Sequence, residues 1–194
     1  MSRFRSNRRG WWAGSAAVEF AIVAPFIIMF FAGAAETVSY LRIWYRLEQA
    51  AASAASAGAR AETLNTAAVA GLFEAARVVA APHSAWSLAG GPGRARTVVS
   101  VVSNPTNGNV VSWTCSRGDS SLVSQVAGTA TLPAAMTVPR GQSVLVVEIM
   151  NSSTPWMIMS ASWLMNTRGP PLVRTHVIVR PRSAELSTLT GGCP

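Results

Sequence analysis

Glu19 stands at the start of an apolar run, five residues after Gly14, and its position is the most informative in the chain. Residues 20–35 carry no charge, and residues 15–35 carry only this one, close to the roughly 20 apolar residues that a spanning helix needs. A carboxylate carried to mid-membrane would cost up to about 2.5–3.5 kcal/mol, so such an acid indicates a function. A cut between Gly14 and Ser15 would place Glu19 fifth in the new chain, close to the Ser15 ammonium.

Three kinds of targeting sequence fit a basic leader followed by an apolar run. A plain signal anchor would keep the whole segment, and a secretory signal peptide would be cut after the small residues 32–34. A prepilin leader would be cut after Gly14 and would leave the apolar run in the mature chain. Only the third explains Glu19, because the other two gain nothing from this carboxylate. Four arginines within residues 3–9 predict a cytoplasmic N-terminus.

The elements that position these residues predict an α+β fold, with a long N-terminal membrane-spanning helix and then a small, mostly antiparallel β domain. Good helix formers continue to residue 60, with a kink expected at Pro25 and an interruption at Gly58 or residues 63–66. A second helix is expected over residues 66–81, ended by Pro82. We divide the chain into a leader at 1–14, a helical region at 15–81, a linker at 82–95 and a β-rich exported domain at 96–194.

Short β-branched runs predict the strands of the C-terminal domain. Residues 96–102 and 110–115 flank Asn107-Gly108, which is a strong turn signal, and therefore predict a hairpin. Further strands are expected at residues 143–150 and 175–180. Glu148 interrupts the first of these, where we expect it on a solvent face or paired with an arginine.

Three segments have two interpretations that the sequence leaves open. Tyr40, Trp44 and Tyr45 fit either a membrane-interface belt or the core of the exported domain. The alanine-rich residues 50–61 either allow neighbouring backbones to approach closely or simply favour a helix. The Trp- and Met-rich residues 154–166 form either a core segment, which we favour, or an interaction patch.

Catalytic and metal-binding side chains are scarce, which argues against an enzyme and predicts no cofactor and no metal site. The chain has one aspartate, Asp119, and two histidines, His83 and His176, in unrelated contexts. The two cysteines, Cys115 and Cys193, have neither zinc-knuckle nor redox-motif spacing. In an exported domain one disulfide between them is expected, but two free thiols fit the sequence equally well.

The net charge of +8, from 16 arginines and 8 acidic residues, first suggests an anionic partner. Four of the arginines lie in the first nine residues, so the chain after Gly14 has 12 arginines against 8 acids. The remaining arginines are scattered, without a basic stripe or a nucleic-acid-binding motif. We therefore interpret the excess as a topology signal and expect no nucleic-acid partner.

Residues 14–25, with the sequence Gly-Ser-Ala-Ala-Val-Glu-Phe-Ala-Ile-Val-Ala-Pro, resemble the opening of the TadE-like minor pilins of tight-adherence (Flp-type) pili. The resemblance continues through Glu36 and residues 47–51 to Arg60, and it returns loosely at residues 146–149 and 177–182. It implies that the prepilin peptidase cuts between Gly14 and Ser15. It also implies that Glu19 acts in recognition or assembly by pairing with the Ser15 ammonium of a neighbouring subunit.

The resemblance further implies a structural role as a minor pilin, or pseudopilin, in pilus initiation and surface adhesion. The implied partners are the prepilin peptidase, other pilin subunits, membrane lipid and the inner-membrane assembly platform. The chain would cross the bacterial inner membrane once, with its C-terminal domain in the periplasm or in an extracellular pilus. A signal-anchored periplasmic binding or adhesion module outside any pilus is the alternative, and an exported enzyme is a third hypothesis.

Overall fold

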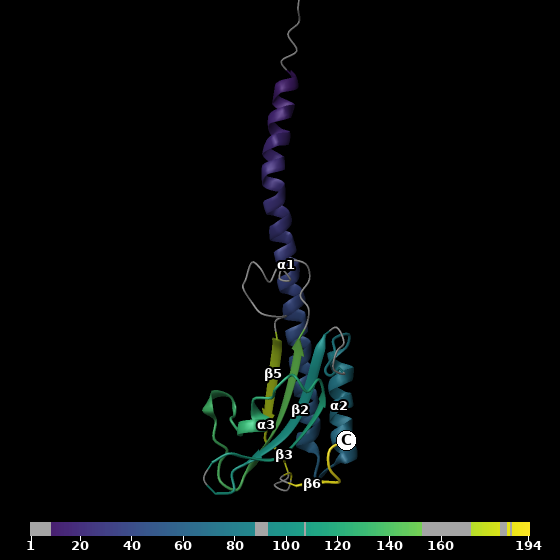
Figure 1. Cartoon of the computed structure of the whole chain (residues 1–194), viewed down its shortest axis with the longest axis vertical. Coiled ribbons are helices and arrows are strands. Elements are labelled where there is room, and N and C mark those ends of the chain that lie inside the picture. Colours follow the sequence, from purple (N-terminus) through teal and green to yellow (C-terminus); the bar gives the residue numbers. More distant parts are fainter. Residues whose placement is uncertain (1–8, 88–92, 107, 153–171, 183–185, 187) are drawn as a thin grey trace, which may run out of the picture. The chain divides into compact units, whose positions relative to one another are not determined.

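The computed structural model describes residues 9–87, 93–106, 108–152, 172–182, 186 and 188–194 and confirms the α+β fold (Figure 1). A long apolar N-terminal helix, α1 (Arg9–Arg60), is followed by a small antiparallel sheet. The chain forms two compact units, Met1–Ser39 and Tyr40–Pro194, so α1 contributes to both of them.

Within the first unit, α1 is helical without interruption through Pro25. The kink at this proline stays a prediction. Further along, the Thr37 hydroxyl donates to the Gly33 carbonyl at 2.8 Å, and the Ser39 hydroxyl donates to the Ala35 carbonyl at 2.9 Å. Both hydroxyls are therefore satisfied by the helix itself, which suits an apolar environment.

The helical part of the second unit contains the end of α1, the short strand β1 (Leu64–Asn65) and α2 (Thr66–Ala80). The Asn65 side chain accepts a hydrogen bond of 2.8 Å from the Ala68 N–H, so it caps the start of α2. An interruption of the helical region was expected at Gly58 or at residues 63–66. Gly58 lies inside α1, and the helix is interrupted at the second of these positions. The second helix ends one residue earlier than predicted.

Four antiparallel strands form the sheet in the order β3-β2-β4-β5. They are β2 (Arg94–Ser103), β3 (Val110–Gly118), β4 (Ser143–Ser152) and β5 (Leu172–Val179). Pairing of β2 with β3 confirms the predicted hairpin. Between β3 and β4 lie the short helices α3 (Val126–Thr129) and η1 (Pro133–Ala135), and near the C-terminus β6 (Leu189–Thr190) pairs in parallel with β1.

Each face of the sheet has its own hydrophobic core. On one face, alternate residues of the strands pack against the second-unit part of α1 and against α2. Figure 1 shows these two helix segments beside the sheet. This core includes Val99 and Val147 of the sheet and Leu47 and Phe73 of the helices. On the other face, Val102 and Val146 pack against residues of the segment between β3 and β4. The central strand β4 is consequently buried along its whole length.

The alanine-rich part of α1 is used for packing within the second unit. Its buried face consists of Ala50, Ala51, Ala54 and Ala55, all at most 1% exposed. A Cβ added to Gly58 would lie only 2.5 Å from Leu145 Cδ2 in β4. The small residues thus let α1 approach the sheet closely, so the first interpretation holds for contacts inside this subunit.

The C-terminal segment is fastened to the second unit at three points. Cys193 forms a disulfide with Cys115 of β3, across 78 residues of sequence. The hydroxyl of Thr66 donates to the Gly192 carbonyl at 2.9 Å, beside the pairing of β6 with β1. The Trp113 indole N–H donates to the Leu186 carbonyl at 2.9 Å. Cys115 and Leu186 belong to the core on the helix-covered face, so the C-terminal segment is held on that side of the sheet.

Candidate membrane and assembly segment

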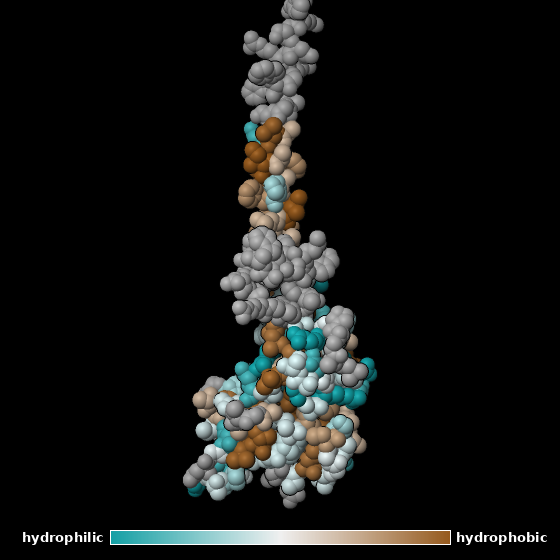
Figure 2. Space-filling view, in the orientation of Figure 1, coloured by the Kyte–Doolittle hydropathy of each residue, from teal (hydrophilic) through white to brown (hydrophobic). Residues whose placement is uncertain are grey.

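The apolar part of α1 in the first unit leaves its large side chains exposed. Phe20, Phe26, Ile28, Phe30 and Phe31 are each between 66% and 71% exposed. Figure 2 shows hydrophobic residues along this part of the helix. Among the described residues, one helix is long and apolar enough to cross a membrane, and its most apolar window has no buried residue. Such a surface is unfavourable in water, so it is suited to lipid or to partner helices.

The predicted processing residues lie in the first turns of α1. Gly14 and Ser15 have helical backbone, and Glu19 follows Ser15 by four residues on the same helix. A four-residue spacing places two positions on one helix face, about 6 Å apart along the axis. A positive charge created at Ser15 and the Glu19 carboxylate would therefore occupy the same face.

The three aromatic residues after the apolar run are exposed in the second unit. Tyr40 is 38% exposed, Trp44 42% and Tyr45 59%, whereas the intervening Ile43 packs against the core. The interpretation of these aromatics as core residues is therefore wrong. Tyr45, two residues before Leu47, lies on the opposite face of α1, whereas Tyr40 and Trp44, seven and three residues before it, lie on the same side as Leu47 and are exposed all the same.

Glu148 lies on the sheet face opposite the helices and is 2% exposed. Its carboxylate accepts a hydrogen bond of 2.5 Å from the Ser124 hydroxyl and a longer one of 3.4 Å from the Gln125 N–H. The Arg174 Nε lies 3.5 Å from the same carboxylate. The arginine pairing is confirmed, and the solvent-face expectation is wrong because the segment before α3 covers this carboxylate.

Asp119 also has a structural role. It is 3% exposed, and its carboxylate accepts a 2.9 Å hydrogen bond from the Ser121 N–H. This bond is the main reason that the pKa of Asp119 is lowered, and the Arg94 guanidinium at 3.9 Å lowers it further. The Asp119 side chain is therefore held within a turn rather than presented to a partner.

The two histidines lie apart. His83 follows the end of α2, and burial followed by the charge of Arg46 lowers its pKa. His176 pairs across strands with Glu148, on β5. Within the described part of the chain, no cluster of three or more metal-ligating side chains occurs. Residues 154–166 lie outside the described residues.

Comparison with known proteins gives one result, and it concerns the N-terminal segment. Residues 14–60 match the family model described as TadE-like protein, which confirms the resemblance over these residues. No curated protein and no solved structure matches the chain. The matched range includes Gly14, Ser15 and Glu19 and the whole exposed apolar run. The chain is therefore similar to TadE-like proteins over residues 14–60.

Proposed function

We propose that the protein is a minor pilin, or pseudopilin, of a tight-adherence pilus, with a structural role in pilus initiation and adhesion. The observation that carries this proposal is Glu19, at the start of an exposed apolar helix within a TadE-like segment. The prepilin peptidase removes residues 1–14, and the rest of α1 stays with the mature chain. The arginines of the leader keep the N-terminus cytoplasmic, and the C-terminal domain is periplasmic or in the pilus.

Glu19 sets the register between subunits. After cleavage each subunit carries a Ser15 ammonium and a Glu19 carboxylate on one helix face. Among apolar helices a charge is tolerated when it is paired and costs several kcal/mol when it is not. A neighbouring helix shifted along the axis by about four residues, or about 6 Å, would place its ammonium beside this carboxylate. The pair therefore favours one stagger and disfavours others. Other pilins and the inner-membrane assembly platform are the partners that this role needs.

The mature N-terminus tests the processing step. The protein is isolated from cells with and without the prepilin peptidase, and its N-terminal residue and intact mass are determined. We expect Ser15 when the peptidase is present and an uncleaved leader when it is absent. A mature chain that starts at Ala35 would instead indicate a secreted binding module, and an uncleaved chain in both strains would indicate a plain anchor.

Substitution of Glu19 tests the assembly step separately. We expect Glu19→Ala to be inserted into the membrane but incorporated poorly into pili, because the Ser15 ammonium of the neighbour loses its partner. Glu48→Ala is the matched control, since it removes an exposed carboxylate from the same helix, far from the cleavage site. The amount of the protein in sheared pili is measured relative to the amount in the membrane. Normal incorporation of Glu19→Ala would rule out this role of Glu19.

A further inference from the structure

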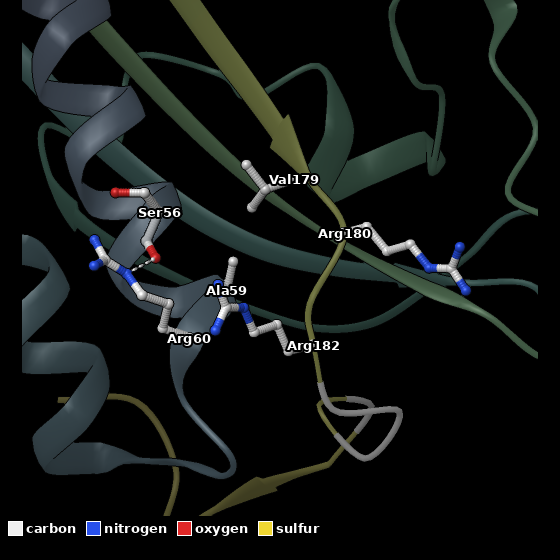
Figure 3. A pocket seen from close by; sticks show the side chains of 6 residues that line it. All are labelled: Ser56, Ala59, Arg60, Val179, Arg180 and Arg182. Atoms are coloured by element: carbon white, nitrogen blue, oxygen red, sulfur yellow. Dashed lines mark hydrogen bonds between the residues drawn. The ribbon is translucent and has the colours of Figure 1, made fainter.

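A basic pocket of about 440 Å³ lies in the second unit, between the last turn of α1 and the end of β5 (Figure 3). The residues that line it are Ser56, Ala59, Arg60, Val179, Arg180 and Arg182. Small and aliphatic side chains thus form part of its wall, and three arginines contribute to its lining. Sequence reasoning missed the site because its arginines come from distant parts of the chain.

Hydrogen bonds hold two of the arginines at the pocket. Arg60 Nε donates to the Ser56 carbonyl at 3.1 Å, and the backbone N–H of Arg182 donates to the Ala59 carbonyl at 3.1 Å. Figure 3 shows the end of the Arg182 side chain near Ala59 and the Arg60 guanidinium beside Ser56, on the side away from Arg182, whereas Arg180 points away. Two positive charges held at one pocket repel each other, so an anion between them would be stabilised.

The second unit has more arginines than acidic residues, and the pocket arginines are part of this excess of positive charge. Residues 40–194 contain 12 arginines and 6 acidic residues. Three of the acids, Glu74, Asp119 and Glu148, pair with arginines outside the pocket. Among the ion pairs between described residues, none includes Arg60 or Arg182. The pocket is therefore complementary to a negatively charged ligand.

The position of the pocket at the end of β5 favours an extended peptide as that ligand. The sheet order ends with β5, and no described strand pairs with its outer edge. An edge strand offers backbone N–H and C=O groups to an added strand, and side-chain pockets along it select the sequence. Guanidinium groups bind carboxylates with two parallel hydrogen bonds. We propose that the β5 edge and this pocket dock an extended, acidic segment of a partner protein, with a carboxylate between Arg60 and Arg182.

The test uses the purified full chain in detergent micelles and two labelled peptides, acetyl-(Glu-Val)₄-amide and acetyl-(Gln-Val)₄-amide, in a fluorescence anisotropy titration. We expect only the acidic peptide to bind. Arg60→Gln and Arg182→Gln should each weaken its binding by about two- to fivefold, and the double variant by about five- to twentyfold. Arg42→Gln removes the same charge from α1 outside the pocket and should leave the affinity unchanged. Binding should also weaken as salt is added.

A charge reversal separates a specific site from a loss of folding. We expect Arg182→Glu to prefer acetyl-(Arg-Val)₄-amide over the acidic peptide, which a misfolded variant would not do. Equal binding of both neutral and acidic peptides, or equal losses in the Arg42 and Arg182 variants, would overturn the proposal. Tighter binding of oligogalacturonate or of oligo-dT at the same residues would assign the pocket to a polysaccharide or a nucleic acid instead. None of these outcomes depends on cleavage at Gly14, so failure here is distinct from failure of the proposed function.

Discussion

Removal of the Glu148 carboxylate should open the segment that covers one face of the sheet. Glu148→Ala removes the carboxylate that accepts from the Ser124 hydroxyl and the Gln125 N–H. It also removes the ion-pair partner of Arg174, whose guanidinium keeps its 2.9 Å hydrogen bond to the Val123 carbonyl. Breaking a buried ion pair by removing one partner costs about 3–5 kcal/mol. The Arg174 side chain is 23% exposed and the Gln125 bond is long, so we expect the lower end, about 3 kcal/mol. Glu148→Gln keeps an acceptor of the same shape and should cost about 1–2 kcal/mol.

Amide hydrogen exchange of the full chain measures this effect where it arises. Ser124 Oγ also accepts from the N–H groups of Val126 and Ala127, at 3.2 and 3.1 Å, so the first turn of α3 depends on the same cluster. A loss of 3 kcal/mol corresponds to about 150-fold faster exchange of these amides if they exchange by local opening. Amides of α2, which packs on the other face of the sheet, should change less.

Glu74→Ala is the matched control, because it also removes a carboxylate that contacts arginines. Glu74 lies 2.7 Å from Arg77 and 3.7 Å from Arg117, but its side chain is 45% exposed. Exposed ion pairs contribute about 0.2–1 kcal/mol, so this variant should be nearly neutral. The reasoning is refuted if Glu74→Ala and Glu148→Ala cost the same, or if Glu148→Gln is as damaging as Glu148→Ala.

Three further predictions concern stability. Cys193→Ser should lower the free energy of unfolding, measured in urea, by about 2–4 kcal/mol, because the disulfide to Cys115 closes a long loop. As a check, the variant and the reduced wild type should have the same free energy of unfolding. Gly58→Ala should be destabilising by about 1–2 kcal/mol in the same assay, because overpacking against Leu145 outweighs the gain in helix propensity; a stabilised variant would contradict the tight contact. The pKa of His83 is lowered in the fold, so the unfolded chain binds more protons and stability should fall as pH drops below about 6.5; His83→Gln should remove that part of the pH dependence, and an unchanged profile would exclude it.

Much of the fold could be predicted from local patterns in the sequence. The long helix and the hairpin each depend on residues that are close together in the sequence. They are predicted by the apolar run before residue 36, the turn signal at Asn107-Gly108 and the β-branched strands that flank it. The run of residues from Gly14 to Pro25 likewise predicted the similarity to TadE-like proteins, because that similarity lies in the local sequence.

Tertiary structure decided what depends on residues far apart in sequence. The alanines of α1 could favour a helix or a close contact, and only the structure shows that they are buried in a core shared with the sheet, with Gly58 against Leu145 of β4. The sequence left the pairing of Cys115 and Cys193 open, and the fold of the C-terminal segment joins them. Periodicity placed Glu148 in a strand but not beneath Ser124, because the covering segment has no regular pattern of its own. The sequence shows where Arg60 and Arg182 stand in the chain but not that they line one pocket, because that pocket is formed by the packing of distant elements.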